Sequence, residues 1–203
     1  MIPAIQGLDI YLLDQILKER FDMSDRILDA GCGRGRNMGW FAKNGFKIEG
    51  CDLYEEALYD AQVATGLSST VFKRAALEQL PYENESFNAI ICSAVLHFAQ
   101  SETHFKMMVA ELVRVLKPDG ILFIRMTSDF GLPKNYKALG DGRYLLADGS
   151  ERFLLTERLF FEMKKEHQLF QIEPVKSTLV EELRSMTTLV MQKRSDLLFL
   201  LEV

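Results

Sequence analysis

A glycine-rich segment near the N-terminus, LDAGCGRGRN at residues 28–37, carries the residue types that most clearly indicate ligand binding. Glycines between a strand and a helix expose backbone N–H groups at the start of the helix, where they bind polar or charged ligands. A dinucleotide site would need the pattern G-x-G-x-x-G, but Arg36 stands in place of the third glycine. Asp29 would moreover repel a pyrophosphate and attract a ligand with positive charge, such as an ammonium or a sulfonium. The segment therefore predicts a site for a cationic ligand.

Strand-like and helix-like segments alternate on both sides of this loop. The run FNAIICS is almost wholly apolar, as is typical of a strand buried on both faces of a parallel sheet. Repeated strand–helix units favour right-handed crossovers in an open, doubly wound α/β sheet, which binds ligands at the carboxyl ends of its strands. Helices are expected at residues 8–21, 37–44, 55–64 and 102–116, and strands at 26–30, 46–51, 70–75, 87–93 and 121–126.

The second half of the chain departs from this alternation. Residues 127–155 are rich in turn-forming Gly, Pro and Asp, and they predict an inserted loop above the carboxyl ends of the strands, where it would cap a substrate pocket. A helix is expected at 156–167 with Thr156 as its N-cap. The strand-like segments LFQIEP and SMTTLVMQK then predict a closing antiparallel hairpin, with a single helical turn between them as the alternative. The placement of the apolar segment 197–203 stays open.

Length and composition favour one globular domain over residues 1–203. The chain is 48% hydrophobic and 26% charged, which excludes disorder as its main state. Its 24 basic and 29 acidic residues give a net charge of −5, and this disfavours a protein that binds nucleic acid through bulk phosphate contacts. The apolar runs are all too short to span a membrane, so we expect a soluble protein.

The three cysteines are odd in number and lie far apart without a ligand-like spacing, so neither a disulfide framework nor a metal site is expected. The first residues carry no early Lys or Arg, unlike a signal peptide. We therefore expect a cytoplasmic location. The oligomeric state cannot be predicted from the sequence.

Over roughly residues 27–126 the chain resembles the class I S-adenosylmethionine-dependent methyltransferases. Their first motif is an acidic residue followed by G-x-G-x-G, and the segment DAGCGRG matches it. The later segment LPY, followed by an apolar strand, matches another stretch of the family. The resemblance implies a mostly parallel, seven-stranded, Rossmann-like methyltransferase sheet that ends in an antiparallel hairpin, and S-adenosylmethionine as the cofactor.

The same resemblance implies roles for several residues along the cofactor. Asp29 and the backbone of Gly31, Cys32 and Gly33 would hold its methionine part. Asp52 would accept hydrogen bonds from both ribose hydroxyls, because one carboxylate suits two adjacent hydroxyls. Leu53 would pack on the adenine.

Ala76 departs from the family pattern, which often has an adenine-binding Asp there, and Leu77 would offer its backbone instead. Ser93 and His97 follow the strand where family members line the meeting point of methyl group and acceptor. His97 is the candidate general base, since an imidazole near neutral pKa accepts the proton of an O, N or S nucleophile. Arg36 would approach the methionine carboxylate or an anionic substrate.

The expected opening helix, within residues 1–25, would fold over the cofactor as a lid through Asp9 and Tyr11, with an ordinary amphipathic helix as the alternative. The implied function is direct methyl transfer to an acceptor that we expect to be a small molecule. Two other classes remain open: a non-catalytic sensor or scaffold that binds S-adenosylmethionine, and a nicotinamide-linked oxidoreductase. The sequence identifies neither the acceptor nor the atom that is methylated.

Overall fold

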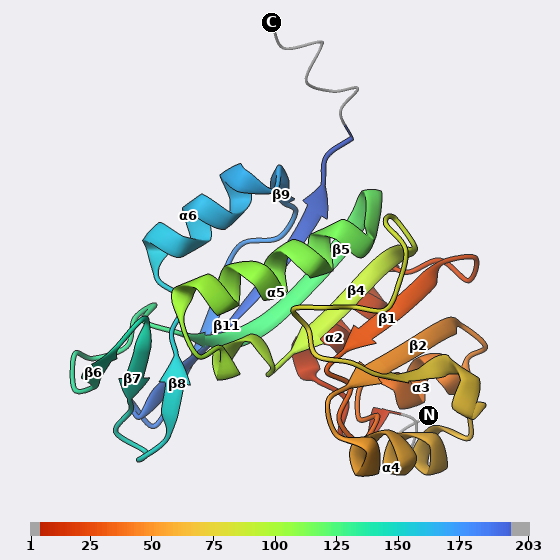
Figure 1. The fold of residues 1–203 in the computed structure, drawn as a ribbon, viewed down its shortest axis with the longest axis horizontal. Helices are drawn as coiled ribbons and strands as arrows, with labels where there is room; N and C mark the ends of the chain where they lie inside the picture. The colour runs from red at the N-terminus through yellow and green to blue at the C-terminus, as the bar shows by residue number, and fades with distance from the viewer. Residues whose placement is uncertain (1–4, 196–203) are drawn as a thin grey trace, which may run out of the picture.

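The computed structural model describes residues 5–195, which form a mixed sheet with helices on both faces (Figure 1). The strands follow the order β10-β11-β5-β4-β1-β2-β3, and β9 pairs with β11 off this path. Strands β1 to β5 run parallel, whereas β11 is antiparallel to β5, β9 and β10. The strands are β1 (Arg26–Ala30), β2 (Lys47–Asp52), β3 (Phe72–Arg74), β4 (Phe87–Ser93), β5 (Leu116–Ser128), β9 (Leu169–Gln171), β10 (Lys176–Val180) and β11 (Arg184–Lys193).

The helices divide between the two faces of the sheet. Those packed on the sheet are α2 (Ile10–Leu17), α3 (Met38–Lys43), α4 (Glu55–Thr65), α5 (Glu102–Val115) and α6 (Glu157–Glu166), and η1 (Ser69–Val71) and η2 (Leu96–Phe98) are short 3₁₀ turns. Strand β4 shows why there are two cores. Ile90 and Cys92 lie in the core under α5 and α6, whereas Ala89 and Ile91 lie in the core with residues of α2, α3 and α4. Successive strand residues point to opposite faces, so a continuous apolar run fills both cores.

Helix boundaries follow local chemistry. Ser101 caps α5 by accepting the His104 N–H, and Thr156 caps α6 by accepting the Leu159 N–H, as predicted for α6. Helix α4 ends at Gly66, which adopts the left-handed conformation that favours glycine. The opening helix is shorter than the expected 8–21, because Asp9 caps it and the chain turns at Lys18 and Glu19.

The doubly wound α/β fold and the antiparallel hairpin are confirmed; within residues 5–195 the main order of the sheet has seven strands, and β9 pairs with β11 as an eighth. The sequence predicts segment 169–174 as the hairpin partner of β11. Strand β9 lies within this segment and does pair with β11. Strand β10, which the sequence pattern did not reveal, forms the hairpin itself. Its tip is a turn at Glu181 and Glu182, both with positive φ, instead of a helical turn.

The segment expected as an inserted loop, 127–155, contains a second sheet. It is formed by β6 (Lys137–Gly140), β7 (Arg143–Leu145) and β8 (Glu151–Phe153), all antiparallel. These strands are too short to show an alternating pattern in the sequence. The apolar segment 197–203 lies outside the described residues. No helix in the described part of the chain is long and apolar enough to cross a membrane.

Candidate functional site

The carboxyl ends of β1 and β2 lie side by side, because these parallel strands pair Asp29 with Gly50 and Ala30 with Cys51. Asp29 is 1% exposed, and its Oδ2 is buried without a hydrogen-bond partner. Burial raises the pKa of Asp29 to about 7. The positive charge of Arg36 lowers this pKa, and the negative charge of Asp52 raises it by a smaller amount. A buried carboxyl group with an unpaired oxygen fits a cationic group on a ligand, which would stabilise its ionised form.

The glycine loop connects the two acids. Gly31 and Cys32 donate their N–H groups to the Cys51 carbonyl, at 2.8 and 2.9 Å. Gly33 donates to Oδ2 of Asp52 at 2.9 Å, and Tyr54 donates to Oδ1 at 3.0 Å. A carboxylate oxygen accepts more than one hydrogen bond, so Asp52 retains capacity for a ligand hydroxyl.

Gly31 is the position where glycine is required by both conformation and space. Its φ is +75°, and a Cβ atom would lie 2.4 Å from Cγ2 of Val95. The loop therefore passes so close to the segment after β4 that a side chain cannot fit between them.

Beyond Asp52 the surface is hollowed by an open pocket whose lining includes Leu53, Tyr54 and Arg74. Leu53 is 49% exposed although it is apolar, as a residue that packs on a ligand ring would be. Ala76 is half-buried and Leu77 is buried in the loop after β3, and the Ala75 N–H bonds to the Asp52 carbonyl at 3.0 Å. The residues expected near an adenine thus adjoin the Asp52 segment.

Helix α2 is joined to this edge of the sheet through its cap, Asp9. The Asp9 carboxylate accepts from Ser93 Oγ at 3.2 Å and from Arg125 Nη1 at 3.2 Å, and it caps the helix through the Tyr11 N–H at 2.9 Å. The Asp9 N–H in turn donates to Asn37 at the end of the glycine loop. Asp9 is 4% exposed, so these contacts bury a charged pair. The sequence pointed to Asp9 but missed Arg125, whose signal is a lone charge in the apolar strand segment ILFIRM.

His97 lies in η2, the short turn that follows the carboxyl end of β4. The sequence predicts that the acceptor binds at this end of the strand. His97 is buried at 6% exposure, and its Nδ1 has no hydrogen-bond partner. Burial, with the charges of Arg152, Arg184 and Arg125, lowers the pKa of His97 to about 4. The imidazole is therefore neutral at physiological pH.

The remaining predicted residues take simpler positions. Arg36 is exposed beside the loop, where its charge favours the ionised form of Asp29. Burial raises the pKa of the Cys32 thiol, so the thiol stays protonated, and the Cys32 N–H and carbonyl bond to Cys51 and Gly35 within the fold. The residues in the described range 5–195 contain no group of three or more His, Cys, Asp or Glu arranged to hold a metal ion.

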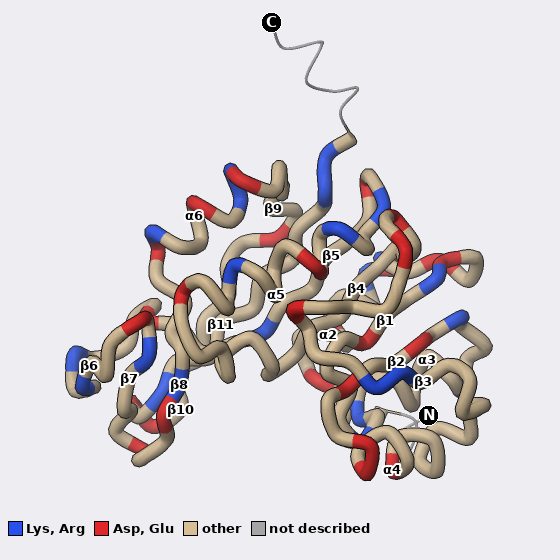
Figure 2. The backbone as a smooth tube through the Cα atoms, viewed as in Figure 1, with Lys and Arg blue, Asp and Glu red and all other residues tan. Residues whose placement is uncertain are grey.

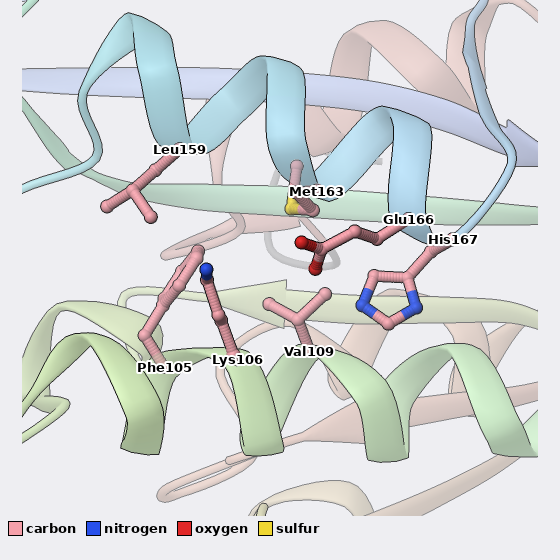
Figure 3. A pocket seen from close by; sticks show the side chains of 7 residues that line it. All are labelled: Phe105, Lys106, Val109, Leu159, Met163, Glu166 and His167. Atoms are coloured by element: carbon pink, nitrogen blue, oxygen red, sulfur yellow. The ribbon is translucent and has the colours of Figure 1, made fainter.

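A separate small pocket lies between α5 and α6 (Figure 3). It is lined on α5 by Phe105, Lys106 and Val109, and its other lining residues come from α6 or its C-cap. None of the predicted site residues contributes to it. It is a gap in helix packing and not part of the candidate site.

Residues 28–124, slightly under half of the chain, match the family of methyltransferase domains. An uncharacterized protein of Haemophilus influenzae is 39% identical over 50% of this chain and 42% of its own length. A tRNA (carboxymethyluridine(34)-5-O)-methyltransferase of Arabidopsis thaliana is 38% identical over 48% of this chain and 23% of its own length. The solved structure of a SAM-dependent methyltransferase from Methanosarcina mazei has a TM-score of 0.71 at 21% identity, over 89% of this chain and 98% of that one.

The alignments with the two curated relatives span less than half of each relative's length. Residues 28–124 match the model of a methyltransferase domain, and the described part of the chain shares its fold with the solved methyltransferase structure from Methanosarcina mazei. The unpaired oxygen of Asp29 is the atom of this site that would face a cationic group on a ligand.

Proposed function

We propose that the protein transfers the methyl group of S-adenosylmethionine to an O, N or S atom of a small-molecule acceptor. The observation that carries this proposal is the pair of acids, Asp29 and Asp52, at the ends of neighbouring strands with the amides of the glycine loop between them. The cofactor supplies a methyl group that is already activated by its sulfonium. The protein then has chiefly to align the acceptor with that methyl group, and alignment alone contributes about 7–11 kcal/mol in favourable cases.

Each predicted residue has a defined part in this proposal. Asp29 and the backbone of Gly31, Cys32 and Gly33 face the methionine part, and Arg36 approaches its carboxylate. The ribose binds Asp52. The adenine lies between Leu53 and the loop of Ala76 and Leu77, where the hollow beside Asp52 supports this orientation. Ser93 lies between cofactor and acceptor.

His97 is proposed as the group that takes the acceptor's proton. Its lowered pKa keeps it unprotonated, so that the imidazole is able to accept a proton in the neutral range. A group with a pKa of about 4 is a weak base, which suits a reaction in which alignment contributes most. The inserted sheet β6–β8 is proposed to cover the acceptor.

The proposed acceptor is a small molecule because the chain is acidic overall. The name of the Arabidopsis thaliana relative describes action on tRNA. Transfer RNA therefore belongs in the acceptor screen as the competing class. The proposed location is the cytoplasm, which suits three cysteines that are all free and buried.

Calorimetric titration with S-adenosylmethionine tests the cofactor site. Asp52→Ala removes a charged acceptor of two hydroxyl hydrogen bonds, and we expect at least tenfold weaker binding. Asp52→Asn keeps one acceptor oxygen and should lose less. Glu83→Ala, an exposed acid in the loop before β4, is the matched control. Equal affinities in Asp52→Ala and in the unmutated protein would show that the ribose binds elsewhere.

Turnover distinguishes an enzyme from a sensor. Release of S-adenosylhomocysteine in the presence of an acceptor establishes catalysis, whereas cofactor binding without turnover across the screen supports a sensor or scaffold. A nicotinamide dinucleotide that binds in place of S-adenosylmethionine would support the oxidoreductase alternative.

A further inference from the structure

The charges of three arginines, each from a different strand, lower the pKa of His97. Arg125 belongs to β5, where it pairs in register with Ser93, and its carbonyl accepts the Ala94 N–H at 2.7 Å. Arg152 belongs to β8, which packs against η2 and is tied to β5 by the hydrogen bond from Thr127 Oγ1 to the Phe153 carbonyl. Arg184 begins β11, next to the register pair of Ser185 and Ser128. The topology therefore brings separate parts of the chain to one place.

Two of these arginines are already neutralised. Arg125 forms its ion pair with Asp9 at 3.2 Å, and Arg184 forms one with Asp148 at 3.2 Å. Arg152 differs, because within residues 5–195 no carboxylate lies within ion-pair distance of its guanidinium. Its Nη1 donates only to the neighbouring Glu151 carbonyl. The three arginines and two aspartates leave one positive charge at this place.

Arg152 is also held toward His97 by an aromatic ring. Its guanidinium lies over the Phe98 ring at 5.1 Å from the centroid, and the Phe98 ring lies 4.5 Å from the His97 ring in an edge-on arrangement. Stacking on an aromatic face fixes the plane of a guanidinium and leaves its N–H groups free at the edge. Figure 2 shows basic residues along the neighbouring strands β7 and β8.

The buried His97 completes the arrangement. Its unpaired Nδ1 is a polar atom without a partner, and its neutral state is a direct effect of burial and the surrounding arginines. A buried polar atom without a partner carries a free-energy cost. Arg152 is only half-buried, so its guanidinium remains accessible to a ligand. An oxyanion would pair with it, since guanidinium binds carboxylate and phosphate oxygens with charge-assisted hydrogen bonds.

We infer that the acceptor carries an oxyanionic group, a carboxylate or a phosphate, which binds Arg152 beside His97. This inference rests on the proposed methyl transfer and names the chemical class of its acceptor. The negative charge would hold the acceptor at the carboxyl edge of β4 and β5, next to Ser93. It would also offset the arginine charges that disfavour protonation of His97.

The chain contains three histidines, so their imidazole NMR signals provide a test with internal references. His104 pairs with Glu78 and His167 ends α6, away from the arginines named above. The probes are benzoate and phenyl phosphate, with benzamide as the neutral analogue of benzoate, added with and without S-adenosylhomocysteine. We expect either anion to shift the His97 signal and raise its pKa, without a comparable effect on His104 or His167. The anion with the higher affinity identifies carboxylate or phosphate as the preferred group.

Arg152→Gln should weaken binding of that anion at least tenfold. Arg158→Gln is the matched control, because Arg158 is an exposed arginine on α6 that pairs with Glu102 and Glu162. The inference is overturned if no anion affects His97, if benzamide acts like benzoate, or if the two variants bind the anion equally. Calorimetry with S-adenosylmethionine is independent of this test, so failure of the anion site and failure of the cofactor site are distinguishable.

Discussion

Asp29 is a buried acid whose ionisation opposes folding in the absence of a cationic ligand. Its pKa rises from 3.8 to about 7 because burial disfavours the charged form. The native state therefore holds the proton more tightly than the unfolded state does. The resulting contribution to stability is complete below about pH 4 and is lost as the pH rises through about 7.

Asp29→Asn tests this directly. At pH 8 the variant should be more stable than the unmutated protein, and the difference should disappear near pH 4, as measured by urea unfolding at both pH values. Asp22→Asn is a control in which stability should depend on pH in the opposite direction. Hydrogen bonds from Ser24 lower the pKa of Asp22, so the stability that the Asp22 carboxylate contributes is lost as the pH falls. An Asp29→Asn variant that is less stable at pH 8 would contradict the expected burial effect.

Gly31 gives a second prediction for a single residue. Gly31→Ala adds a Cβ in a left-handed conformation and against Val95, so it should destabilise the protein clearly more than Gly66→Ala. Gly66 also has positive φ, but open space surrounds its Cβ position, and its substitution should cost about 1 kcal/mol. Unfolding free energies of the two variants measure the difference. Adding Val95→Ala should recover part of the loss in Gly31→Ala, and no recovery would show that the close approach is unimportant.

At the scale of elements, the carboxyl ends of three strands could be predicted from the sequence, because β1 leads into a glycine, β2 ends at Asp52 and β4 is an apolar run that ends at Ser93. Strand β10 could not, since KSTLV alternates between half-buried and exposed positions and has little apolar signal. The contact of Asp9 with Ser93 spans 84 residues, and local pattern carries no information about such a distance. The contacts of Arg125 with Asp9 and of Arg152 with Phe98 also join distant parts of the chain, so the sequence pattern did not reveal them.

Helix α2 depends on Asp9 for two separate effects, an N-cap and a buried ion pair. Asp9→Ala removes both and leaves Arg125 without its partner, so we expect a loss of about 3–5 kcal/mol in the free energy of unfolding. Asp9→Asn keeps the cap and isolates the ion pair. Ser101→Ala, which removes only the cap of α5, should cost about 1 kcal/mol. Urea unfolding that gives equal losses for Asp9→Ala and Ser101→Ala would show that the ion pair adds nothing.

At the scale of the whole molecule, the inserted sheet and the main sheet share one core. Phe153 of β8 is fully buried, and its ring stacks on Phe105 of α5 at 5.0 Å between centroids. Sequence composition indicated an insertion after β5 and its place above the strand ends, but composition does not show that one strand of it enters the main core. The fold class, in contrast, follows from the alternation of strands and helices alone.

Phe153→Ala should therefore destabilise the main domain by about 3–5 kcal/mol, although Phe153 lies in the insertion. The single tryptophan, Trp40 on α3, reports unfolding of the other face of the sheet through its fluorescence. We expect the Trp40 transition to shift to lower urea in Phe153→Ala and to shift much less in Tyr144→Ala, which affects only the small cluster within the insertion. An unchanged Trp40 transition in Phe153→Ala would show that the insertion unfolds independently.

The stacking of Phe153 on Phe105 also limits which parts of the insertion can be varied by protein engineering. Sequence changes at the turn around Gly149 affect exposed positions, whereas a Cβ at Gly142, in the turn between β6 and β7, would lie 2.4 Å from the Phe153 ring. Libraries that vary the turn around Gly149 therefore retain the stacking, whereas changes at Gly142 or replacement of the entire insertion would disturb the core that both sheets share.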